Sequence, residues 1–266
     1  MRKIKILSIM LFIVSVAIFI AYGVYEKSTS DTTLPVLQCE TEELVVSVGV
    51  TEEELMQGVT AHDNESGDVS DTLVIESISA FTEENTRVIT YAAIDEKGNV
   101  GRCQRTLVYT DYQRPKFSLS EPLRFPMGKN VDILERINAY SVLDGDLSDK
   151  IKYTLDSTID LASTGVYSVE YRVTDSSGNV EYLPVEIQVY DPTEERIQVV
   201  LSQYLVYVPV GSAFEPNGYY VGSDIEGTLT VQSGVNTASE GIYYVDYVVT
   251  GLNGIGKNRL VVVVTG

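Results

Sequence analysis

Apolar and polar side chains alternate along most of the chain, with the period of two that predicts half-buried β-strands. The pattern is clearest in residues 165–174, where one face of the predicted strand carries Tyr167, Val169, Tyr171 and Val173. The Asp, Gly and Asn of residues 175–179 favour a tight turn, because Asp bonds nearby amides and Gly and Asn tolerate positive φ. A second strand, running back along the first, is therefore expected after this turn.

This strand and turn recur twice. Tyr91, Asp95, Gly98 and Asn99 each lie 80 positions before Tyr171, Asp175, Gly178 and Asn179, while Gly241 and Tyr247 lie 76 positions after Gly165 and Tyr171. The acidic segment 144–149 is matched, 78 positions away on either side, by segments 66–71 and 222–227. Two independent landmarks with nearly one spacing predict three tandem modules of roughly 75 to 80 residues.

The repeats and the apolar pattern divide the chain into five parts. A cytoplasmic tip and membrane anchor (1–27) and a linker (28–34) precede the modules 35–111, 112–191 and 192–266. The two junctions contain Pro and charged residues and are short, which predicts a semi-rigid rod. Seven or so short strands per module indicate an all-β fold of three immunoglobulin-like antiparallel sandwiches after an N-terminal transmembrane helix.

The motifs of the first two modules resemble a known group. The first module pairs A-x-D-x-x-x-G-D-V-S-D (61–71) with Y-x-x-x-D-x-x-G-N-V (91–100), and a closing alternating strand follows. This combination is similar to the bacterial immunoglobulin-like repeats of Gram-positive surface proteins, which also occur in some pesticidal crystal toxins. The resemblance covers residues 35–266 approximately and is weaker for the third module. It implies a non-catalytic extracellular sandwich that serves as spacer or adhesive unit, without fixing a ligand.

The N-terminus carries the membrane signal. Residues 6–25 contain no charge, follow Arg2, Lys3 and Lys5, and are long enough to span a bilayer core. The basic flank predicts a single-pass cell-membrane protein with a cytoplasmic N-terminus and extracellular modules. The alternative is a signal peptide cleaved near Gly23, since Ala21 and Gly23 are small residues at the positions a signal peptidase recognises.

Charge and composition narrow the functional classes. The net charge of −19 excludes nucleic acid as an expected partner, because phosphate binding needs a basic surface. Catalysis has little support either, since the single histidine, His62, leaves no Ser or Cys triad and the sequence holds no metalloprotease or phosphate-loop motif. A non-enzymatic protein without a catalytic cofactor is expected.

The two cysteines and three tyrosines are candidates for a disulfide and for a binding surface, respectively. Cys39 and Cys103 belong to the opening and closing strands of the first module, which can lie side by side, and a disulfide between them is weighed against two buried thiols. In the third module Tyr244 and one of Tyr219 and Tyr220 are expected to be exposed, so these three are the candidates to contact a sugar or a protein. The alternative is that they are ordinary strand residues, since Tyr is common in strands.

The acidic loops offer the oxygen ligands that calcium requires. In the second module the proposed ligands are Asp144, Asp146, Asp149 and Asp175, and in the first they are Asp68 and Asp71, beside Asp63 and Glu65. The loops that carry them cluster at one end of an immunoglobulin-like sandwich, near the preceding junction. Ordinary turn chemistry is the alternative, because Asp caps neighbouring amides without a metal. In the metal case calcium raises the melting temperature of the second module, and Asp146→Ala abolishes the rise.

Taken together, the sequence predicts a membrane-anchored surface protein that acts as a spacer or binds another envelope protein. The alternatives are an adhesin or carbohydrate-binding protein with its contact surface on the third module, recognising a surface polysaccharide, and a secreted protein after cleavage.

Overall fold

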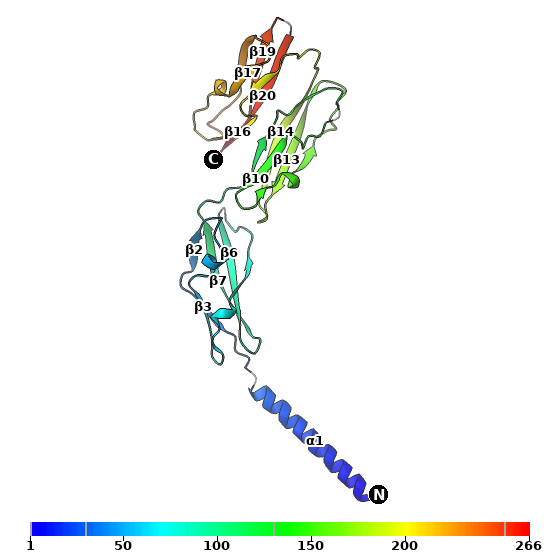
Figure 1. Ribbon diagram of the computed structural model, residues 1–266, viewed down its shortest axis with the longest axis vertical. Helices are drawn as coiled ribbons and strands as arrows, with labels where there is room; N and C mark the ends of the chain where they lie inside the picture. The colour runs from blue at the N-terminus through cyan, green and yellow to red at the C-terminus, as the bar shows by residue number, and fades with distance from the viewer. Residues whose placement is uncertain (1, 30, 84, 130, 253) are drawn as a thin grey trace. The chain divides into compact units, whose positions relative to one another are not determined.

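The chain folds into two compact units, residues 1–110 and 111–266 (Figure 1). This computed structural model describes residues 2–29, 31–83, 85–129, 131–252 and 254–266. The first unit holds the N-terminal helix and the first module, and the second unit holds the other two modules. The all-β, immunoglobulin-like fold expected for the three modules is confirmed.

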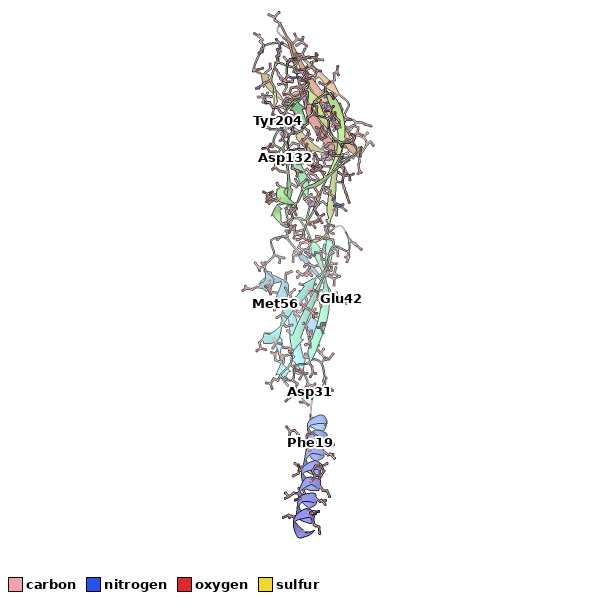
Figure 2. All side chains as sticks on the ribbon, turned by 90° about the vertical axis from the view of Figure 1, so that its right-hand side faces the viewer. Phe19, Asp31, Glu42, Met56, Asp132 and Tyr204 are labelled. Carbon is pink, nitrogen blue, oxygen red and sulfur yellow. The ribbon has the colours of Figure 1, made fainter. Side chains whose placement is uncertain are left out.

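The apolar N-terminal segment forms one helix, α1 (Arg2–Thr29). Its stretch Lys5–Tyr25 is long and apolar enough to cross a membrane, with a mean hydropathy of 2.6, and a signal sequence would meet the same criterion. Side chains all round it are exposed, among them Phe19, marked in Figure 2. The helix covers the first two positions of the expected linker 28–34, and residue 30 lies outside the described residues.

The first module is a sandwich of two sheets. Its elements are β1 (Val36–Cys39), β2 (Glu43–Val46), α2 (Glu52–Met56), β3 (Val59–Asp63), β4 (Gly67–Asp68), the 3-10 turn η1 (Ser70–Thr72), β5 (Val74–Ile78), β6 (Thr86–Ile94) and β7 (Val100–Tyr109). One sheet has the order β1-β3-β4 and the other β2-β7-β6-β5. The opening segment thus divides between the sheets, and its second half, β2, pairs parallel with β7 while the neighbouring pairs are antiparallel.

The second module repeats this arrangement. Its elements are β8 (Lys116–Leu119), β9 (Arg124–Pro126), β10 (Ile137–Ser141), β11 (Gly145–Asp146), η2 (Ser148–Lys150), β12 (Lys152–Leu155), β13 (Gly165–Thr174) and β14 (Val180–Tyr190). The sheets are β11-β10-β8 and β12-β13-β14-β9. The matching registers, His62 opposite Asp68 and Tyr140 opposite Asp146, reproduce the repeat spacing of the sequence.

The third module keeps the large sheet and reduces the small one. Its elements are β15 (Val199–Leu201), β16 (Leu205–Pro209), η3 (Pro216–Tyr219), β17 (Tyr220–Ser223), β18 (Thr228–Ser233), β19 (Gly241–Gly251) and β20 (Gly254–Thr265). The sheets are β15-β17 and β16-β20-β19-β18.

The second and third modules share apolar packing. Along β20, Leu260, Val262 and Val264 belong to the core of the third module, whereas Val261 and Val263 pack against the core of the second. The same alternation occurs in β16, where Leu205 and Tyr207 contact the core of the second module. Both faces of the large sheet of the third module are therefore covered, which explains the uninterrupted apolar run 260–264.

Polar contacts reinforce this packing. The Phe117 amide donates to the Tyr207 hydroxyl at 2.9 Å, and the Glu186 amide donates to the Tyr244 hydroxyl at 3.0 Å. Arg259 also joins Glu186 at 2.7 Å. The repeat spacing predicts two successive sandwiches, and in the structure the apolar packing between them joins both in one compact unit, residues 111–266.

Candidate metal centre

Three aspartates from separate segments converge at the end of the first module where the chain enters it. Asp31 precedes β1, Asp63 ends β3 and Asp95 follows β6. One carboxylate oxygen from each lies within 4.8 Å of the other two. Figure 2 marks Asp31 at this end of the module. The side chains are 8%, 1% and 6% exposed, so the cluster is almost closed to solvent.

Alternation along β3 directs Asp63 inward. Val59 and Ala61 fill the core from the same face of the strand, and Asp63 is the next residue on that face. Its Oδ1 accepts from the amides of Glu65 at 2.9 Å and Ser66 at 2.8 Å. One oxygen of this carboxylate is thus fixed by the turn that follows the strand, which leaves Oδ2 for the cluster.

Asp95 is held by the turn between β6 and β7. Its Oδ1 accepts from the amides of Lys97 and Asn99, both at 2.8 Å, and its Oδ2 accepts from Asn99 Nδ2 at 2.7 Å. Gly98 allows this turn because its φ is +91°, a conformation that other residues rarely adopt. The carboxylate therefore has a fixed orientation.

Asp31 joins the cluster from the segment before the first strand. Its Oδ1 accepts from the Thr33 amide at 2.8 Å, and its backbone carbonyl accepts from Asn99 Nδ2 at 3.2 Å. Asn99 therefore contacts both Asp31 and Asp95, and it docks the entering chain on the turn between β6 and β7.

The surroundings favour charged carboxylates at Asp63 and Asp95. Hydrogen bonds from the backbone amides of Ser66 above all, and of Glu65 and Asn64, lower the pKa of Asp63 against the raising effects of burial and the nearby Asp95. Burial would raise the pKa of Asp95, but hydrogen bonds from Asn99 and neighbouring amides outweigh it, and the pKa is lowered. Both groups are consequently negative at neutral pH.

Two oxygens of the cluster lack partners. Asp31 Oδ2 and Asp63 Oδ2 are buried and accept no hydrogen bond from the described residues. No Lys, Arg or His in the described part of the chain forms an ion pair with any of the three aspartates. Buried charged oxygens are normally paired or bound to a metal, so this arrangement suits a cation.

At the corresponding end of the second module, the buried carboxylate is compensated by hydrogen bonds from the protein. Asp175 is the counterpart of Asp95, but Ser141 stands where the first module has Asp63. The Tyr112 hydroxyl donates to Asp175 Oδ2 at 2.8 Å, and Asn179 Nδ2 donates to the Tyr112 oxygen at 2.6 Å. Burial, with Asp175 nearby, raises the pKa of Tyr112, which keeps the hydroxyl protonated as a donor. One carboxylate here is thus satisfied by protein donors.

The acids singled out from the sequence occupy other positions. Asp68 and Asp146 are exposed, and each accepts from the amide two residues on, Ser70 at 3.0 Å and Ser148 at 2.9 Å. Asp71 and Asp149 are also exposed. The Ser176 amide donates to Asp144 Oδ2 at 2.8 Å, so the two loops of the second module do meet. Among the described residues, however, the three-carboxylate cluster contains none of these five acids, nor Asp175.

The sequence contained part of the signal for the cluster. Asp63 belongs to the acidic loop that the sequence offers for calcium, and the repeat spacing makes Asp95 the counterpart of Asp175. Asp31 was missed, because it lies in the expected linker and no periodic pattern connects it to residues 32 and 64 positions later in the chain.

Cys39 and Cys103 lie close together as thiols, with sulfurs 2.8 Å apart. The second half of the opening segment, β2, pairs with the closing strand β7, but Cys39 lies in the first half. It is in β1, whereas Cys103 is in β7 of the opposite sheet, because the opening segment divides and only β2 pairs with β7. Burial, followed by the contact with Cys39, raises the pKa of Cys103 to about 12. A disulfide across the sandwich stays a prediction.

The three tyrosines of the third module are partly buried. Tyr219 and Tyr220 pack against the core of their own module, and the Tyr219 ring stacks on Phe214 with ring centroids 5.6 Å apart. Tyr244, expected to be exposed, packs against the core of the second module, because that face of the sheet is covered. The third module also has Gly251 at the position of Asp95 and Asp175, so it lacks the central acid of the cluster.

Comparisons with known proteins find similar chains but do not assign this chain to a family. No family model matches the chain. A curated relative, an uncharacterised 81.3 kDa protein of Acholeplasma phage L2, is 30% identical over 109 residues, which cover 39% of this chain and 15% of that protein. The chain thus matches only a small part of that relative.

Solved structures align over most of the chain. A carbohydrate-binding module with INT domains of Clostridium perfringens ZmpB, solved with GlcNAc, is 17% identical and covers 87% of this chain and 42% of that one, with a TM-score of 0.24. Three cadherin domains of human CDH23 are 14% identical over 87% of this chain and the whole of that one, with a TM-score of 0.23. A lipoprotein of Bacteroides thetaiotaomicron is 11% identical over 86% and 99%, with a TM-score of 0.22.

Proposed function

We propose that the chain is a non-catalytic, membrane-anchored surface protein whose immunoglobulin-like modules act outside the cell as a spacer or as an interaction unit for another envelope protein. The observation that supports this most is α1, whose stretch Lys5–Tyr25 is apolar on every side and precedes modules with well-formed cores. A net charge of −19 suits folded modules that face water and cations.

The membrane role is tested with the full chain in a bacterial host, carrying a C-terminal epitope tag. The expected result is that alkaline carbonate leaves the protein in the membrane fraction, while protease added to intact cells removes the tag. Replacing Val14 and Val16 together by Arg is expected to abolish membrane retention, because each charge at the centre of a helix costs about 2.5–3.5 kcal/mol of insertion free energy. The matched control replaces the same two residues by Leu.

The mass of the protein from the same cells distinguishes anchoring from secretion. An intact N-terminus supports the anchor, and a chain that begins near Gly23 and is found in the medium supports the cleaved alternative. Retention that is equal in the Arg and Leu variants would contradict the membrane role.

A second candidate is an adhesin that binds a surface polysaccharide through the third module. The stacked rings of Phe214 and Tyr219 border a hollow that Pro209 and Ser212 also line. An aromatic ring at the border of a hollow suits stacking on a sugar. The full chain in lipid nanodiscs is expected to bind cell-wall polysaccharide in a pull-down, and Tyr219→Ala to lose this binding, while Tyr140→Ala, at an exposed position of the second module, retains it. Capture of an envelope protein alone would favour the spacer.

A further inference from the structure

We propose that Asp31, Asp63 and Asp95 bind a calcium ion that fastens the entering chain to the first module. The ligand atoms lie within 4.8 Å of one another. Calcium takes oxygen ligands at about 2.3–2.6 Å, so two ligands of one ion are separated by about 5 Å at most. The cluster therefore has the spacing of a shared ion without movement of the backbone.

The partnerless oxygens point to a cation in addition to the acidic cluster. Asp31 Oδ2 and Asp63 Oδ2 are buried, and the described residues donate no hydrogen bond to them. A buried carboxylate without donors is unfavourable unless it is protonated or bound to a cation. The amides of Ser66 and Asn99, which bond Asp63 and Asp95, favour the ionised state of these two groups over protonation.

The second module provides an internal comparison. There Ser141 stands in the place of Asp63, and the Tyr112 hydroxyl donates a hydrogen bond to Asp175 Oδ2 at 2.8 Å. The two modules thus share a fold and a turn but differ in the group that compensates the acid. The first module has Asp63 where the second has Ser141, and the Oδ2 atoms of Asp31 and Asp63 receive no donor from the described residues, so a positive ion would compensate these acids instead.

The donor set favours calcium among biological cations. All three ligands are carboxylates, and neither His nor Cys belongs to the cluster, which disfavours zinc. Magnesium demands near-octahedral geometry and keeps several waters, whereas calcium accepts irregular sets of carboxylate oxygens in nearly closed sites. The three residues are only 1% to 8% exposed, so the cluster has little contact with bulk water, which disfavours an ion that keeps several waters.

The ion would join the chain before β1 to the end of β3 and to the β6–β7 turn. In the structure, the Asn99 side chain already connects Asp31 to that turn. Calcium binding is therefore expected to protect the segment around residues 31–35 from proteolysis, independently of the cellular location of the protein.

The test uses the full chain in lipid nanodiscs, with calcium added to protein that has been stripped by chelator. Isothermal titration is expected to show one site per chain, and scanning calorimetry to show a higher melting temperature for the first module. Asp63→Ser, which introduces the residue of the second module, and Asp31→Asn are each expected to weaken calcium binding at least tenfold. The matched control Asp146→Asn, at an exposed acid of the second module, is expected to bind as the parent does.

Several outcomes would overturn the proposal. One is that calcium gives the parent protein neither a heat of binding nor a shift in melting temperature. Another is that Asp63→Ser binds calcium as tightly as the parent does. Loss of binding in Asp146→Asn with retention in Asp63→Ser would assign calcium to the acidic loop of the second module instead. Asp31 lies outside the strands, so Asp31→Asn keeps the test valid if Asp63→Ser fails to fold, and circular dichroism verifies folding of each variant.

Discussion

A buried tyrosine hydroxyl performs the same task in each module. Tyr91 donates to the Leu55 carbonyl at 2.6 Å and Tyr171 to the Ile133 carbonyl at 2.9 Å, while Tyr247 donates to the carbonyl of Pro216. The three rings are 0% exposed. Each bond fixes a short helical or turn segment on the large sheet, which explains why this tyrosine recurs in all three repeats.

Replacing Tyr171 by Phe is expected to reduce the free energy of unfolding by about 1–3 kcal/mol, because the Ile133 carbonyl loses its buried donor. Urea denaturation of the full chain in nanodiscs measures the change. The control is Tyr140→Phe, whose ring is 60% exposed and whose hydroxyl removal is expected to have little effect. Equal changes in the two variants would contradict the role of the buried bond.

The cysteine pair is the second feature at this scale. Because the sulfurs are 2.8 Å apart and the residues are 64 positions apart, an oxidant is expected to close a long loop across the sandwich. The gain in unfolding free energy over the reduced protein is expected to be up to about 4 kcal/mol by loop entropy.

Intact mass after oxidation and denaturation in the presence and absence of reductant measure the effect. The double variant Cys39→Ser with Cys103→Ser is the control, and its stability is expected not to depend on reductant. Full labelling of both thiols in protein treated with an oxidant would show that no bond forms.

At the scale of elements, the large sheet of the third module explains the divergence of this repeat. Strand β13 of the second module carries polar residues on its outer face, such as Glu170 and Arg172, whereas β16, β19 and β20 carry apolar residues on both faces. The extra apolar face, with Leu205 and Val261, is packed against the second module. Divergence in sequence here reflects burial.

Leu205→Ala is expected to destabilise the second unit by about 2–5 kcal/mol, since it removes buried methyl groups from the shared core. Chemical denaturation of the full chain is the measurement. The matched control is Val221→Ala, at a side chain that is 64% exposed, and its effect is expected to be near zero. A loss confined to the third module would contradict a shared core.

At the scale of the whole molecule, the division into two compact units predicts how the modules unfold. The second and third modules share the core that contains Leu205 and Val261, together with the ion pair between Arg259 and Glu186 at 2.7 Å. Elements with common buried contacts unfold cooperatively. The modules are therefore expected to behave as two units rather than three.

Scanning calorimetry of the full chain in nanodiscs is expected to resolve two transitions, one for residues 31–110 and one for residues 111–266. Asp63→Ser should alter only the first and Leu205→Ala only the second, which makes each variant a control for the other. Three separate transitions would show that the apolar face shared by the second and third modules does not make them unfold together.

The local and repeating features of this protein can be predicted from its amino-acid sequence. Period-two alternation identified Val169, Tyr171 and Val173 as core, and the spacings of 80 and 76 positions located the strands and turns of three modules. The glycines of the predicted turns, such as Gly98 and Gly178, do adopt the positive φ expected there, +91° and +86°. These features depend on neighbours along the chain, so a single sequence displays them.

The tertiary structure alone decided which distant residues meet. Asp31, Asp63 and Asp95 come together through the entry of the chain, a strand end and a turn, and no periodicity relates the first to the others. The covering of Tyr244 likewise depends on a second module that packs on its sheet. Alternation shows which face of a strand a residue occupies, but only the assembled sheets determine whether that face meets solvent, another module or a cluster of acids.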